Sequence, residues 1–121
     1  MNDENRREQG MAVRRSVLGD EHVDRAIDAT TGLTADFQDL ITRYAWGEIW
    51  SRPGLVRRDR SIAVISSLIA LGQWDELGLH LRAALRNGLT RDEIVEVILQ
   101  SAVYAGVPAA NRAFALANDL L

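Results

Sequence analysis

Apolar residues recur at intervals of three and four positions along this chain, and no stretch shows the sustained apolar and polar alternation of a half-buried strand. Leu77, Leu81, Ala84 and Leu85, for example, fall on one side of a helix drawn at about 100° per residue, whereas Arg82 falls on the other. We expect the first four of these residues to contact the core. The spacing therefore predicts an all-α fold of about six to seven helices.

Residues that start or stop helices divide this pattern into segments. Gly72 and Gly88 follow apolar stretches and are suited to ending them, whereas Thr90 and Glu93 form a capping box. We expect helices at about residues 11–18, 20–29, 35–50, 57–71, 74–87, 91–104 and 108–121. The polar residues 1–9 are expected to be frayed, and residues 10–121 to form a single domain whose clearest break is the loop at 51–54.

Composition excludes several classes of function. The net charge of −3 leaves no basic patch for nucleic acid, and the lack of cysteine excludes disulfides and thiolate metal sites. No apolar run is long enough to span a membrane, and the N-terminus lacks the apolar stretch of a signal peptide. We therefore expect a cytoplasmic protein with neither a nucleic-acid nor a membrane partner.

Glu76 and His80 lie four residues apart on one flank of the predicted helix at 74–87. At this spacing a carboxylate can hydrogen-bond an imidazole, which raises the pKa of the histidine and fixes its tautomer, as in many general acids. A structural pair at the edge of the core would have the same spacing. The sequence leaves both interpretations open.

A second group of candidate residues surrounds the loop at 51–54. Trp46 and Trp50 flank Glu48 and are either core aromatics or the wall of a pocket in which Glu48, partly removed from water, carries a proton. The cations of Arg57, Arg58 and Arg60 crowd a helix start, where the helix dipole disfavours them. They are either solvated arginines paired with acids or a site for an anionic ligand.

Four segments make the chain resemble the carboxymuconolactone decarboxylase family, within the superfamily that includes the AhpD-type peroxidases. They are residues 10–26, 37–54, 79–90 and 103–111. In the peroxidase branch a Cys-X-X-Cys motif precedes the histidine, and its two positions correspond here to Gln73 and Glu76. Peroxidase chemistry is therefore not expected. The relay glutamate of that branch falls at about Ser61, which makes Glu48 the more plausible second acid.

The resemblance implies an AhpD-like helical bundle and the cofactor-free decarboxylation of 4-carboxymuconolactone to β-ketoadipate enol-lactone and CO2, in the protocatechuate branch of aromatic catabolism. It implies a homo-oligomer, typically a hexamer, and a small dianionic lactone as the ligand, with no metal. The expected catalytic residues are His80, oriented by Glu76, with Glu48 as the alternative acid. The expected substrate-binding residues are Arg60, which is favoured, with Arg58, Arg57, Trp46 and Trp50.

Two other functions fit the same residues. One is another enzyme of the superfamily that acts on a related lactone or keto acid. The other is a noncatalytic all-α assembly module, in which Glu76 and His80 would be a structural pair.

Overall fold

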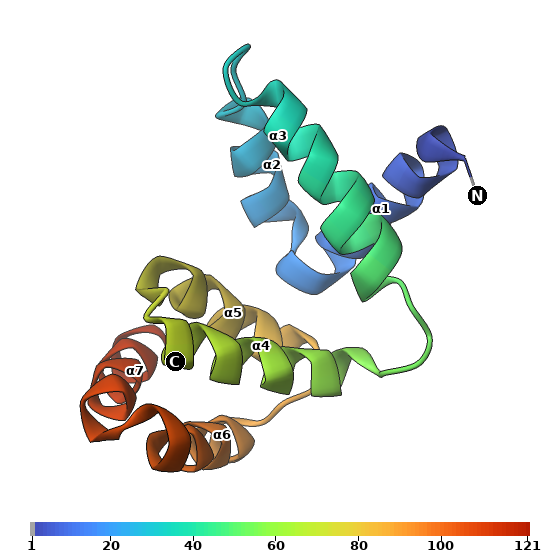
Figure 1. Cartoon of the computed structure of the whole chain (residues 1–121). Helices are drawn as coiled ribbons and strands as arrows, with labels where there is room; N and C mark the ends of the chain where they lie inside the picture. The colour runs from blue at the N-terminus through green and yellow to red at the C-terminus, as the bar shows by residue number, and fades with distance from the viewer. Residues whose placement is uncertain (1) are drawn as a thin grey trace. The chain divides into compact units, whose positions relative to one another are not determined.

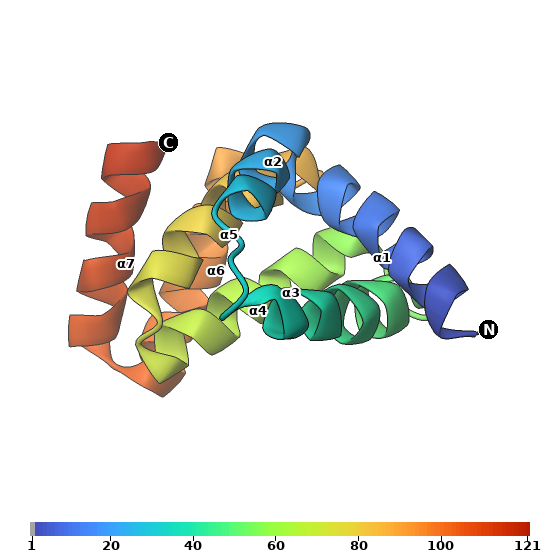
Figure 2. The same cartoon turned by 90° about the horizontal axis from the view of Figure 1, so that it is seen from above.

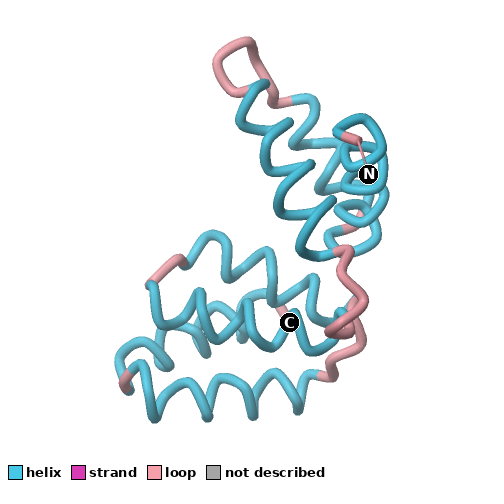
Figure 3. Tube along the Cα trace, turned by 45° about the vertical axis from the view of Figure 1, so that its right-hand side comes forward, coloured by secondary structure: helices cyan, strands magenta, loops and turns pink. Residues whose placement is uncertain are grey.

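The computed structural model describes residues 2–121, and these residues form helices and loops without a strand (Figure 1). The helices are α1 (Asp3–Leu18), α2 (Asp20–Asp28), α3 (Ala35–Ile41), the π-helix η1 (Thr42–Trp50), α4 (Arg57–Leu71), α5 (Trp74–Arg86), α6 (Arg91–Ala105) and α7 (Val107–Leu120). Short loops connect them (Figure 3). The expected all-α fold is confirmed. Within the part of the chain described, no helix is long and apolar enough to cross a membrane.

The chain divides into two compact units, one that ends at Leu55 and one that runs from Val56 to Leu121. The boundary follows the loop at 51–54, which the sequence marks as its clearest break. The first unit holds α1, α2, α3 and η1, and the second holds α4 to α7. A single family domain over residues 10–121 stays a prediction.

The first helix begins earlier than the sequence pattern indicates. Asn2 caps α1 by accepting a hydrogen bond from the backbone N–H of Asn5 at 2.8 Å, and Asp3 and Glu4 lie in the first turn, where the helix dipole favours acids. The expected frayed segment at residues 1–9 is therefore wrong from Asp3 onward; Met1 lies outside the described residues. A polar surface helix needs only a cap and one packed face, and both are present here.

In the first unit, α1 packs closely against η1 because a glycine lies on each side of the contact. A Cβ on Gly10 would overlap the carbonyl oxygen of Thr42, and one on Gly47 would overlap the carbonyl oxygen of Arg6. The expected helix at 35–50 is thus present, but its second half is wound as a π-helix. Hydroxyl groups bond back to carbonyls around it: Thr42 donates to Gln38 O at 2.7 Å and Ser51 to Gly47 O at 2.7 Å.

In the second unit, α4 to α7 surround one apolar core, and α7 lies beside α5 and α6 (Figure 2). The core is formed by Ile65, Ile69, Leu77, Leu81, Ala84, Leu89, Ile94, Ile98, Ala110 and Ala113. The prediction for α5 is confirmed except at Leu85, which is 36% exposed and lies at the edge of the buried stripe. The ends at Gly72 and Gly88 and the capping box of Thr90 and Glu93 are present as expected.

Candidate functional site

His80 lies on the buried side of α5, next to the core stripe that orients the helix. Its neighbours Leu77 and Leu81 are fully buried, and His80 itself is only 8% exposed. Glu76, one turn earlier, is exposed. The imidazole is therefore held in a low-dielectric environment while the carboxylate stays in water, and the expected pairing of Glu76 with His80 stays a prediction.

The three arginines at the start of α4 are all half-buried. Arg58 forms ion pairs with Asp59, at 3.3 Å, and with Glu93 of the α6 capping box. This guanidinium therefore connects the starts of α4 and α6, which supports the structural interpretation at this position. Arg57 and Arg60 stay the candidates for an anionic ligand. Because α4 packs against α5, Arg60 and His80 belong to neighbouring helices of one core.

Ser61, next to Arg60, is fully buried. The family resemblance puts the relay glutamate of the peroxidase branch at about this position. Asn87, which follows α5, donates a hydrogen bond from Nδ2 to Ser61 Oγ at 3.0 Å. The bond connects α4 with the end of α5. Ser61 therefore contributes a structural hydrogen bond at this position.

In the first unit, η1 carries the aromatic candidates. The rings of Trp46 and Trp50 stack with their centroids 5.2 Å apart and their planes at 29°. Trp46 is 7% exposed. Glu48 is exposed, so the expected partial removal of its carboxylate from water is wrong for the single chain. An exposed carboxylate needs cover from a substrate or another surface before it can act as an acid near neutral pH.

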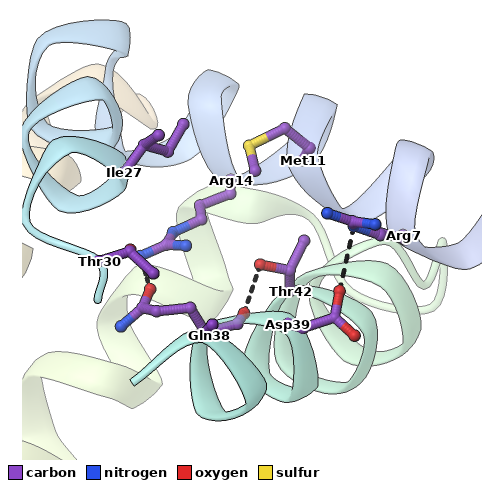
Figure 4. Close-up of a pocket in the computed structure, with 9 residues that line it drawn as sticks. Arg7, Met11, Arg14, Ile27, Thr30, Gln38, Asp39 and Thr42 are labelled. Carbon is purple, nitrogen blue, oxygen red and sulfur yellow. Dashed lines mark hydrogen bonds and ion pairs between the residues drawn. The ribbon is translucent and has the colours of Figure 1, made fainter. Parts of the chain in front are cut away.

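The first unit also contains a cavity of about 360 Å3 that no sequence pattern predicted (Figure 4). Its lining comprises Arg7, Met11, Arg14, Ile27, Thr30, Ala35, Gln38, Asp39 and Thr42. Arg14 is only 6% exposed and occupies a position on α1 between the buried residues Val13 and Val17. A charged residue on the apolar face of a helix was the signal that the sequence offered. Among residues 2–121, no group of three or more His, Asp or Glu side chains is arranged to hold a metal ion.

Comparisons with known proteins give matches that together cover nearly the whole chain. The model of the family described as "Carboxymuconolactone decarboxylase family" matches residues 35–119. A protein of Acinetobacter baylyi named 4-carboxymuconolactone decarboxylase is 51% identical over 120 residues, which cover 99% of this chain and 90% of that protein. A nitrosuccinic acid decarboxylase of Metarhizium robertsii is 46% identical over 101 residues, which cover 84% of this chain and 71% of that protein.

Proposed function

Because the chain belongs to the carboxymuconolactone decarboxylase family, we propose that it converts 4-carboxymuconolactone to β-ketoadipate enol-lactone and CO2. The observation that carries this proposal is the identity of 51% with a decarboxylase of that name across 99% of the chain. The proposal places the enzyme in the protocatechuate branch of aromatic catabolism. It includes a cytoplasmic location.

The reaction sets three requirements for the site. The departing carboxylate lies on a ring carbon that is vinylogous to the lactone carbonyl, so the electron pair left by CO2 passes through the ring double bond to the carbonyl oxygen. The unsaturated lactone thus accepts the electrons itself, and no cofactor is required. The enzyme must hold the dianion, stabilise the negative oxygen and protonate the carbon next to the carbonyl.

We assign proton donation, or a hydrogen bond to the developing oxyanion, to His80. An imidazole titrates near neutral pH, and the burial of His80 keeps competing water away from it. Glu76 would orient the imidazole from the preceding turn of α5, for which its exposed carboxylate must turn toward His80. Glu48 is the alternative acid once substrate or another surface covers it.

The arginines of α4 would bind the carboxylate that stays on the product. Arg60 is favoured, and its guanidinium can hold a carboxylate through two parallel hydrogen bonds. Arg57 and Arg58 are further candidates, and a substrate that binds Arg58 must compete with its ion pairs to Asp59 and Glu93. The stacked rings of Trp46 and Trp50 would contribute an apolar wall, which favours loss of charge from the departing carboxylate.

A related substrate is the main alternative, and the second relative supports it. In nitrosuccinic acid one carboxylate is attached to the carbon that bears the nitro group, so the nitro group can accept the electron pair that CO2 leaves behind. Both substrates named for these relatives therefore need anion binding, a stabilised oxyanion and a proton. The greater identity and coverage with the lactone decarboxylase favour the lactone here.

The proposal includes a homo-oligomer, with a hexamer expected from the family resemblance. Large apolar side chains are exposed on one stripe of α3 and η1, formed by Phe37, Leu40 and Tyr44, and on one stripe of α6, formed by Val95, Leu99 and Val103. Val103 is 76% exposed. Exposed stripes of this kind favour contact with other subunits, because leaving them in water costs free energy.

To test the proposal, the loss of 4-carboxymuconolactone is followed by ultraviolet absorbance after addition of the purified protein, without added metal or cofactor. The product is then identified. Nitrosuccinate is assayed in parallel. Rapid conversion to the enol-lactone with slow turnover of nitrosuccinate would support the proposal. The reverse preference would assign the related substrate. No release of CO2 from either acid by an assembled protein would favour the assembly module.

A further inference from the structure

An apolar stripe on α6 remains exposed after the second unit has packed. Val95, Leu99 and Val103 follow one another at four-residue intervals, so they lie on one face of the helix. Their exposed fractions range from 41% to 76%. The opposite face carries Ile94 and Ile98, which are buried in the core. The second unit therefore uses one face of α6 for its own packing and leaves the other available to a second surface.

The order of residues in this stripe is the same in both directions. Valine, leucine and valine occupy positions 95, 99 and 103. A second α6 that runs antiparallel would place its Leu99 opposite Leu99 and its Val103 opposite Val95. This is the pairing of a two-fold contact, in which residue i meets residue j of the other copy and j meets i. The stripe is thus suited to pairing with itself.

The charges of α6 favour the antiparallel arrangement. Every charged residue of the helix lies within residues 91–96, and residues 97–111 contain none. In the antiparallel arrangement the charged half of each helix faces the uncharged half of the other, so like charges do not meet. A parallel arrangement would instead set Glu96 against the partner's Glu96, and like charges face to face cost free energy.

A groove beside the stripe provides room for apolar side chains of the other copy. It has a volume of about 260 Å3 and is lined by Arg91, Ile94, Val95, Ile98, Phe114, Ala117, Asn118 and Leu121 of α6, α7 and the end of the chain. Residues 91–98 of one α6 come level with residues 100–107 of an antiparallel second copy. Val103 and Val107 lie in that range and are 76% and 74% exposed. The groove of each copy therefore comes level with apolar residues that the other copy exposes.

We propose that α6 of one chain docks antiparallel on α6 of a second copy, with the two-fold axis at Leu99. The inference rests on the homo-oligomer of the proposed function, and it adds the face, the partner segment and the symmetry of one contact. Because a two-fold contact closes on two copies, the subunits are joined in pairs through α6.

Single cysteines test this register, since the chain has no cysteine of its own. The full chain with Leu99→Cys is oxidised mildly, and disulfide-linked dimers are followed on non-reducing gels. A disulfide forms only where two Cα atoms lie about 4–7 Å apart, which a residue on the two-fold axis achieves with its own copy. Val95 and the partner's Val95 would be about 12 Å apart along the helices, at about 1.5 Å per residue. We expect Leu99→Cys to cross-link roughly tenfold faster than Val95→Cys.

A mixed experiment tests the antiparallel direction. Chains with Val95→Cys and chains with Val103→Cys, which carry different tags, are co-expressed and oxidised. We expect the disulfide to join unlike chains, because Val95 faces the partner's Val103. Ser67→Cys is the matched control, since Ser67 is exposed on α4 and should cross-link no faster than Val95→Cys alone. Sedimentation velocity of each reduced variant checks that the assembly persists.

Three outcomes would overturn the proposal. The first is slow cross-linking of Leu99→Cys in an assembly that sediments like the wild type, which would reject the α6 contact but retain the homo-oligomer. The second is faster linkage of Leu99→Cys chains to Leu40→Cys chains, which would identify the stripe of α3 and η1 as the partner of α6. The third is a wild-type protein that is monomeric at every concentration, which would reject the homo-oligomer as well. The lactone assay would still decide the catalytic proposal in each case.

Discussion

Gly47 of η1 lies against the backbone of Arg6 of α1 so closely that a side chain on Gly47 would overlap the Arg6 carbonyl oxygen. On the other side of the same contact, Gly10 faces the Thr42 carbonyl in the same way. The pair of glycines therefore sets the distance between α1 and the helix that carries Trp46, Glu48 and Trp50. Any larger residue must push these two backbones apart.

Gly47→Ala should accordingly destabilise the first unit. Overpacking of this kind costs about 1–3 kcal/mol, and the displacement of η1 should change the fluorescence of the stacked tryptophans. Urea unfolding followed by tryptophan fluorescence measures both effects. Gly32→Ala is the matched control, because a Cβ there meets nothing within 4 Å. Equal stability of the two variants would contradict the steric role of Gly47.

His80→Gln should lower kcat for 4-carboxymuconolactone by roughly 10²–10⁴-fold, the usual contribution of a positioned proton donor. Far-ultraviolet circular dichroism and the unfolding midpoint check that the variant is folded. Glu76→Gln should lower kcat less, because it removes only the orientation of the imidazole. Near-normal turnover by folded His80→Gln would contradict the assignment of proton donation to His80. Glu48 would then be the candidate donor, and Glu48→Gln would test it.

Arg60→Ala should mainly raise KM, by about tenfold or more, because a charged bidentate contact to the spectator carboxylate is lost in both ground and transition states. Steady-state kinetics separates this effect from one on kcat. Arg58→Ala provides the comparison. Because Arg58 forms ion pairs with Asp59 and Glu93, its replacement should lower the stability of the fold with little change in KM. A larger effect of Arg58→Ala on KM would reverse the assignment.

Ser61→Ala should leave kcat nearly unchanged and lower the free energy of unfolding by about 1–3 kcal/mol, because the amide of Asn87 loses its buried acceptor. Chemical denaturation together with the lactone assay tests both statements. Ser67→Ala, on the exposed side of the same helix, should change neither. A large drop in kcat of Ser61→Ala at unchanged stability would instead indicate a role in proton transfer.

Val103→Asp should shift the protein to a smaller species in sedimentation velocity without unfolding it, since Val103 is 76% exposed in the single chain. In a subunit contact the aspartate charge would be buried without a partner, which costs free energy. In the separate chain the same charge lies in water, where this cost is absent. Gln100→Glu places a charge elsewhere on the exposed surface of α6 and should leave the assembly intact. An unchanged sedimentation coefficient for Val103→Asp would exclude this stripe from the interface.

Several features of the fold follow from residues close together in the sequence. Gly72 and Gly88 end helices in positive-φ conformations, and Thr90 and Glu93 satisfy each other's backbone groups at the start of α6. These contacts span at most four residues. The sequence alone therefore determined these helix ends of the second unit, and the four-residue spacing of Glu76 and His80 singled out His80 as a candidate without any knowledge of its neighbours in the fold.

Other features depend on which elements pack together, and only the tertiary structure decided them. The spacing of Phe37, Leu40 and Tyr44 is that of a core stripe, yet all three side chains are exposed, because the other face of that helix packs on α1. The spacing cannot show which face a neighbour covers. The burial of Arg14 and the close approach of Gly10 to η1 have the same origin, since each depends on a helix more than twenty residues away in the sequence.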